Sequence, residues 1–170
     1  KPKVNLKKNF KVQIIRSTLM VTATTFMFYS LQKFDLVDIY VVFFTAPLIV
    51  SLLSAYFLKD ILTIKGIILM LLSFGSIIYS LGPSMKIFSL DLIFPIVPPI
   101  CWALYQFFTK VVSNDNDPFA AIFYTSILGA IIFSIYIIFN WDPLEKNIYW
   151  IYLIILGLAG FISHSLIIYA

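Results

Sequence analysis

Two long uncharged stretches lie back to back in this chain and constrain its fold more than any other feature. The first runs from Ile39 to Leu58, and the second runs from Gly66 to Met85. The connector between them, 59–65, includes three charged side chains. An α-helix rises about 1.5 Å per residue, so a stretch of this length covers the roughly 30 Å hydrocarbon core of a bilayer. The two stretches therefore predict a transmembrane helical hairpin.

The rest of the chain repeats this pattern. Of its 170 residues, 61% are hydrophobic and 12% are charged, whereas about one quarter of an average soluble domain is charged. We therefore expect an all-α protein, a polytopic transmembrane helical bundle with six spans present and a short basic segment, 1–9, before them. The predicted spans are 10–31, 39–58, 66–81, 92–109, 118–141 and 148–170. The uncharged run between Arg16 and Lys33 is short for a span, so we expect both side chains to reach toward the membrane interfaces.

Basic residues predict the orientation and exclude some partners. With a cytoplasmic N-terminus, inside segments would carry 9 of the 12 Lys and Arg residues and outside segments 3. Six of those nine lie between Lys1 and Arg16, and the other loops are balanced. Because the basic residues sit at predicted membrane edges, their partner is the lipid bilayer and not nucleic acid. The single Cys101 excludes an internal disulfide and a cysteine metal cluster.

The hairpin carries a family resemblance. A helix proline at Pro47, a run LLSAYFLKD ending at Asp60, a helix start at Thr63 and a late glycine at Gly75 resemble the EamA-type transporters of the drug/metabolite transporter superfamily. Those proteins close the first run in Leu-Gly-Glu, so Lys59 stands here for the glycine and Asp60 for the glutamate. The resemblance implies ten helices in two inverted five-helix halves, of which this chain would hold helices three to eight.

A weak internal repeat agrees with that reading. When the first span is aligned on the last, Ile14, Ile15 and Tyr29 fall on the identical residues Ile154, Ile155 and Tyr169. The two spans cross the membrane in opposite directions, and inverted repeats are common in secondary transporters. We therefore expect residues 10–82 to end a first repeat and residues 83–170 to begin a second, truncated one.

Polar and aromatic residues recur at helical spacing in three predicted spans and suggest a solute pathway. In each span they are three and four residues apart, so they share one face. A pathway of hydroxyls, amides and rings would bind a polar organic molecule without fixed charge. The alternative is helix packing, in which small and hydroxyl residues are usual. The predicted pathway residues are Thr25, Tyr29, Tyr40, Phe44, Trp102, Gln106 and His164.

Prolines and the single histidine are further candidates. Pro47 and the cluster Pro95, Pro98 and Pro99 would kink their helices, either to allow bending during transport or as static packing features. His164, the only histidine, is ionisable within a predicted span and is therefore a functional hypothesis. A neutral histidine bonded to a neighbouring helix is the alternative.

The sequence thus predicts a transporter that moves a small organic solute or metabolite by alternating access, in a bacterial cytoplasmic membrane. It predicts no cofactor, no metal site and no catalytic set, and leaves a homodimer open. One alternative is a nucleotide-sugar or organophosphate antiporter of the same superfamily, which should place a Lys or Arg in the pathway. The other is a non-transporting membrane subunit or membrane enzyme.

Overall fold

The computed structural model describes residues 9–59, 63–81, 90–113, 118–143 and 146–169, and these residues are helical without strands. Four helices there are long and apolar enough to cross a membrane, and two further apolar helices, 64–77 and 148–163, are shorter. The all-α, polytopic prediction is confirmed. The helices are α1 (Phe10–Leu31), α2 (Leu36–Phe43), α3 (Ala46–Leu58), α4 (Ile64–Leu81), the short 3₁₀ helix η1 (Leu90–Leu92), α5 (Ile93–Ser113), α6 (Pro118–Phe139) and α7 (Ile148–Tyr169).

The described residues form two compact units, which are taken separately. One contains residues 19–111, and the other contains residues 1–18 and 112–170. Helices α1 and α5 each contribute to both units. These packing units are not the two repeats expected from the sequence, 10–82 and 83–170, and the repeat boundary stays a prediction.

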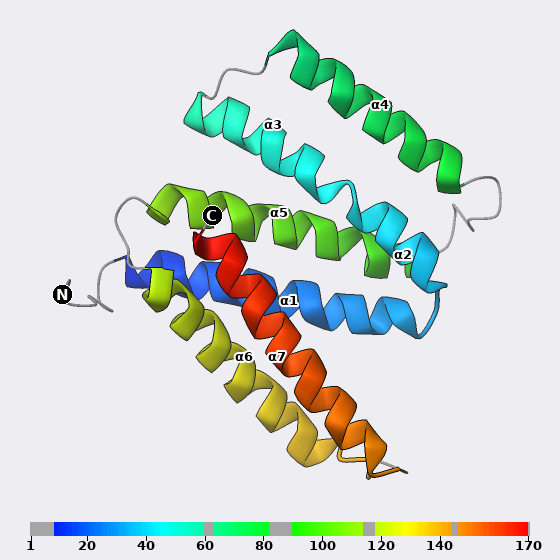
Figure 1. Cartoon of the computed structure of the whole chain (residues 1–170), viewed down its shortest axis with the longest axis vertical. Coiled ribbons are helices and arrows are strands. Elements are labelled where there is room, and N and C mark those ends of the chain that lie inside the picture. Colours follow the sequence, from blue (N-terminus) through cyan, green and yellow to red (C-terminus); the bar gives the residue numbers. More distant parts are fainter. Residues whose placement is uncertain (1–8, 60–62, 82–89, 114–117, 144–145, 170) are drawn as a thin grey trace. The chain divides into compact units, whose positions relative to one another are not determined.

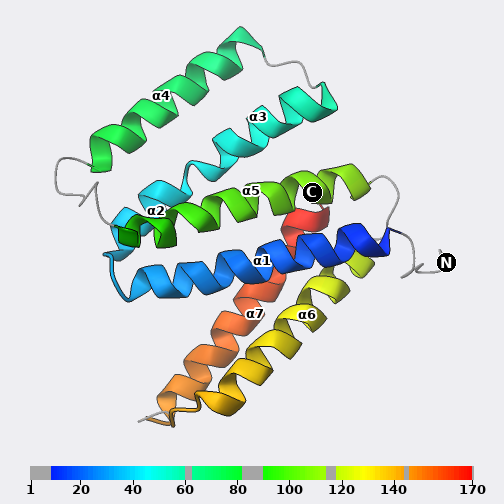
Figure 2. The same ribbon diagram turned by 180° about the vertical axis from the view of Figure 1, so that it is seen from behind.

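In the 19–111 unit, α5 lies between α1 and the α2–α3 segment, and α4 lies on the far side of α3 (Figures 1 and 2). Small side chains and prolines are buried where these helices meet, among them Ala23, Ala46, Ala103 and Pro98. Small residues allow helices in membranes to approach closely. Lys33, beyond the end of α1, pairs with Asp91 in η1, so the end of α1 and the start of α5 lie at the same side of the bundle.

The predicted second span, 39–58, lies within one stretch, Leu36–Leu58, that is long and apolar enough to cross a membrane. Within it the chain forms two helices, α2 and α3, with a break at Phe44 and Thr45, and Pro47 stands in the first turn of α3. A kink of the span at Pro47 stays a prediction. Proline has no N–H and its ring crowds the preceding turn. The carbonyl of Thr45 is the acceptor at the start of α3, because it accepts from the N–H groups of Leu48 and Ile49, each at 3.1 Å. The proline therefore starts α3.

The end of α3 and the start of α4 each have a defined capping residue. Lys59 closes α3 in the left-handed conformation, with φ 55° and ψ 31°, which glycine adopts at lower cost. Thr63 begins α4, because its hydroxyl accepts from the backbone N–H of Gly66 at 3.2 Å. The predicted helix start at Thr63 is confirmed, and Asp60 lies outside the described residues.

Helix α5 runs through Pro98 and Pro99, while Pro95 lies in its first turn. All three prolines are fully buried. The helix is uninterrupted at this buried cluster, and a kink at these prolines stays a prediction.

The second unit places α6 against the start of α1 and packs α7 on α6. Arg16 is 0% exposed and donates to the carbonyl of Ala121 at 2.6 Å and to the hydroxyl of Thr125 at 3.2 Å. Acceptors on α6 therefore bind its guanidinium inside the unit, and its reach toward a membrane interface stays a prediction.

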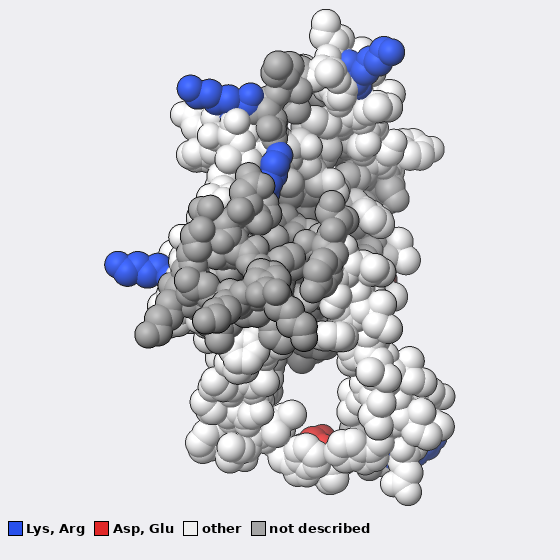
Figure 3. All heavy atoms as spheres, turned by 60° about the vertical axis from the view of Figure 1, so that its left-hand side comes forward, with Lys and Arg blue, Asp and Glu red and all other residues white. Residues whose placement is uncertain are grey.

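Helix α7 is largely exposed apolar surface in the described residues, and Trp150 near its start faces Trp141 after α6 at 6.2 Å. A Cβ added at Gly157 or Gly160 would meet nothing within 4 Å, so the described residues show no close helix contact there. On the face drawn in Figure 3, the described atoms are mostly uncharged, with a few Lys and Arg side chains standing out. This surface is typical of a protein surrounded by lipid.

Candidate functional site

A cavity of about 200 Å³ lies between α1, α2 and α5, entirely within the 19–111 unit. Its walls are mostly aromatic rings and methionines, and no described lining residue is charged. Two of the predicted pathway residues, Tyr40 and Trp102, line it together. The complete lining is Met20, Ala23, Thr24, Met27, Phe28, Tyr40, Phe43 and Trp102.

Local helix structure positions these side chains. Met20, Thr24, Met27 and Phe28 follow one another along α1 at helical spacing and so share one face. The Thr24 hydroxyl donates to the carbonyl of Met20 at 2.9 Å, which leaves its oxygen as an acceptor. Hydroxyl groups commonly bond to the preceding helical turn in this way.

Aromatic contacts connect the walls contributed by α2 and α5. Phe43, the last residue of α2, lies 5.9 Å from the Trp102 ring centroid to centroid, and Tyr40 lies 6.5 Å from Phe43. On the other side, Trp102 contacts Tyr105 at 5.6 Å, and Tyr105 is fully buried. Ring pairs of this spacing are stabilising beyond their buried area, so Trp102 has a fixed place on the cavity wall.

Four other predicted pathway residues, Thr25, Tyr29, Phe44 and Gln106, are not among the residues that line this cavity. Thr25 donates to the carbonyl of Val21 at 2.8 Å within its own helix. Tyr29 stacks on Phe94 at 5.9 Å near the end of α1. Phe44 is 61% exposed, and Gln106 is half-buried one turn after Trp102.

His164 lies in α7, and its side chain is outside the described residues. Sequence reasoning missed Phe43 because Phe44 fits the regular spacing of a continuous helix. Phe43 lies three residues after Tyr40 within α2, so helical spacing also allowed it on the face of Tyr40.

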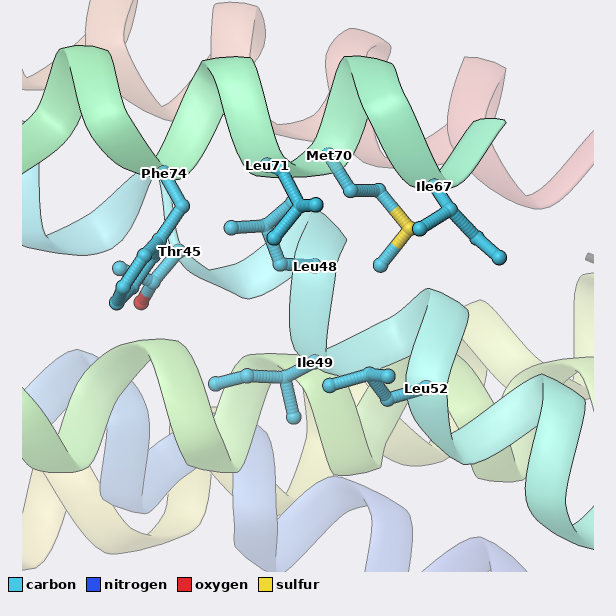
Figure 4. Close-up of a pocket in the computed structure, with 8 residues that line it drawn as sticks. All are labelled: Thr45, Leu48, Ile49, Leu52, Ile67, Met70, Leu71 and Phe74. Atoms are coloured by element: carbon cyan, nitrogen blue, oxygen red, sulfur yellow. The ribbon is translucent and has the colours of Figure 1, made fainter. Parts of the chain in front are cut away.

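A second, larger cavity of about 470 Å³ lies between α3 and α4 (Figure 4). Its labelled side chains are aliphatic, methionine or phenylalanine apart from Thr45. The Thr45 hydroxyl already donates to the carbonyl of Val42 at 2.7 Å. This cavity offers a polar solute little to bond with, so the smaller aromatic cavity is the better candidate site.

No group of three or more His, Cys, Asp or Glu side chains that could hold a metal ion occurs among the described residues. The chemistry of the site is therefore that of a binding surface. Rings can stack on a planar group, methionines adapt to its shape, and hydroxyls orient it.

Comparison with known proteins identifies a family. The model of the EamA-like transporter family matches residues 1–82 and 90–170. No curated protein matches the chain, and no solved structure matches it. The family match covers most of the chain in two regions.

Proposed function

The chain belongs to the EamA-like transporter family, and we propose that it moves a small organic solute across the membrane by alternating access through the aromatic cavity. Members of this family are transporters, and the apolar helices make the chain an integral membrane protein. The observation that carries the proposal is that Tyr40 of α2 and Trp102 of α5, far apart in the sequence, line one cavity.

The size and lining of the cavity favour a small solute with an apolar, planar part. Its volume of about 200 Å³ is below the roughly 300–1,000 Å³ of pockets for drug-sized ligands. Stacking on Trp102 and Tyr40 would hold a ring without fixed charge. The remaining predicted residues, Thr25, Tyr29, Phe44, Gln106 and His164, would then act elsewhere along the pathway. We further propose a bacterial cytoplasmic membrane and an N-terminus on the cytoplasmic side.

The organophosphate antiporter is the less favoured transporter. Phosphate recognition usually uses Arg or Lys, and the eight lining residues include neither. Arg16 is buried, but its described partners are Ala121 and Thr125 in the other unit. The aromatic cavity therefore suits an unphosphorylated solute.

Uptake into proteoliposomes tests the proposal with four labelled solutes that cross lipid slowly: phenylalanine, uridine, glucose and glucose 6-phosphate. We expect saturable uptake of an unphosphorylated solute, reduced roughly tenfold or more by Trp102→Ala. Trp150→Ala, in α7, is the matched control and should keep normal uptake. Uptake of glucose 6-phosphate alone would favour the antiporter, and uptake insensitive to Trp102→Ala would place the pathway elsewhere.

A further inference from the structure

We propose that the contact between the start of α1 and the start of α6 is a gate, which opens to water during transport and closes over the buried amide of Gln13. The inference rests on the proposed function, because alternating access requires helix contacts that open and close. The residues that carry it all belong to the unit formed by residues 1–18 and 112–170.

Side chains near the start of α1 contact α6 through an aromatic pair and through hydrogen bonds. The ring of Phe10 lies 5.7 Å from the ring of Tyr124, at an interplanar angle of 72°. Arg16 donates to two acceptors on α6, and the hydroxyl oxygens of Ser17 and Thr125 are 3.5 Å apart. We call this contact the α1–α6 seam, and it consists of Phe10, Gln13, Arg16 and Ser17 of α1 with Ala121, Tyr124 and Thr125 of α6.

Gln13 lies in the middle of this face of α1. It follows Phe10 by three residues and precedes Ser17 by four, so helical spacing places the three side chains on one face. Gln13 is 1% exposed. In the part of the chain that the structure describes, neither its amide nitrogen nor its amide oxygen has a hydrogen-bond partner. Burial of a donor and an acceptor without partners costs free energy, and contact with water removes that cost.

The α1–α6 seam thus combines contacts that hold it closed with one group that opposes closure. The hydrogen bonds and the ring pair stabilise the closed arrangement, whereas the amide of Gln13 gains partners when water enters. Arg16 and Ser17 are both 0% exposed, so water does not reach the seam in this conformation. Opposed contributions of similar size keep the open and closed conformations close in free energy, which a moving contact requires.

The reaction rate of a thiol placed in the seam measures how often the seam opens. The full chain carrying Ser17→Cys and Cys101→Ser is placed in sealed vesicles, and a charged, impermeant thiol reagent is added to each side in turn, without any solute. We expect Ser17→Cys to react from the side of the N-terminus. Gln13→Met should slow this reaction about tenfold, because methionine can be buried there without the cost of the amide. It should also raise the thermal midpoint of unfolding by about 2–4 °C.

A second variant should act in the opposite direction, and two controls are matched to the test. Thr125→Val keeps the shape of the side chain but removes a hydroxyl that accepts a hydrogen bond in the seam, so it should speed the reaction of Ser17→Cys about tenfold. Ser30→Cys makes the same change at another serine of α1 that is 0% exposed, and its rate should not respond to Gln13→Met. Gln32→Met, at an exposed glutamine, should leave the rate of Ser17→Cys unchanged.

The outcomes separate the gate from the proposed function. An unchanged or faster reaction of Ser17→Cys in the presence of Gln13→Met would overturn the gate. So would equal slowing at Ser30→Cys, or no reaction of Ser17→Cys from either side in any variant. Uptake that still depends on Trp102 in those cases would leave the aromatic cavity as the solute site. Rates that follow the expected pattern in a chain without saturable uptake would overturn the transport proposal and not the opening of the seam.

Discussion

The ring of Phe43, the last residue of α2, lies 5.9 Å from the ring of Trp102 on α5, at an interplanar angle of 52°. This contact connects the cavity wall on α5 to the residue that immediately precedes the helix break. Any change in the angle between α2 and α3 would therefore move a wall of the cavity. The break is thus coupled to the shape of the site.

Phe43 and Phe44 are neighbours with different surroundings, which makes them a matched pair. Phe43 lines the cavity, whereas Phe44 is 61% exposed. We expect Phe43→Ala to reduce saturable uptake by roughly threefold to tenfold, since an aromatic pair contributes about 0.5–1.5 kcal/mol beyond its buried area. Phe44→Ala should change uptake less than about twofold. Equal losses in both variants at matched abundance would contradict the assignment of Phe43 to the wall.

Lys59 should be a strained helix end. Its φ of 55° is costly for a residue with a Cβ, so Lys59→Gly should raise the free energy of unfolding by about 0.5–1 kcal/mol. Lys59→Ala removes the charge but keeps the strain and should give no gain. Lys65→Gly, in the first turn of α4, should destabilise by about 0.5–1 kcal/mol. Thermal unfolding in detergent compares the stability of the three variants. A rise in stability from Lys59→Ala as large as that from Lys59→Gly would contradict a strained backbone at Lys59.

The buried Arg16 should matter for stability. Arg16→Met removes the guanidinium hydrogen bonds to the Ala121 carbonyl and the Thr125 hydroxyl, so we expect a loss of about 1–3 kcal/mol. Lys11→Met removes an exposed cation from the same helix and should change stability by less than about 0.5 kcal/mol. Denaturation of both variants under one condition measures the difference. Equal stability of the two would mean that Arg16 is not held inside this unit.

The all-helical class and the approximate positions of the apolar helices were predictable, because long apolar runs and clustered charges allow few other folds for such a chain. The break at Phe44 and Thr45 was not, since a proline in an apolar run is compatible with both a kink and a new helix start. The inward position of Phe43 does not depend on that break, because Phe43 lies three residues after Tyr40 within α2 and shares its face.

Burial of Arg16 also escaped prediction. Its partner helix, α6, begins only at Pro118, far along the chain, and no local pattern indicates that the carbonyl of Ala121 will meet its guanidinium. Tyr40 and Trp102 were proposed because each lies on a regular face of its helix, and their joint position at one cavity is seen only in three dimensions.

Orientation is open to a labelling experiment. In a Cys101→Ser background, we propose that an impermeant thiol reagent added outside cells reacts with Asn147→Cys, between α6 and α7, and not with Asn9→Cys, before α1. The excess of Lys and Arg near the N-terminus is the reason. Labelling of Asn9→Cys alone from outside would reverse the proposed topology.

Water access to Thr24 tests the central claim most directly, and it requires no knowledge of the solute. Thr24→Cys in the Cys101→Ser background introduces one thiol into the cavity, while Leu69→Cys places one on α4, where the side chain is 64% exposed and would face lipid. A charged, impermeant thiol reagent is added to one side of sealed vesicles and then to the other. Alternating access predicts that Thr24→Cys reacts from both sides and Leu69→Cys from neither. No reaction of Thr24→Cys from either side would show that the cavity is not part of a transport pathway.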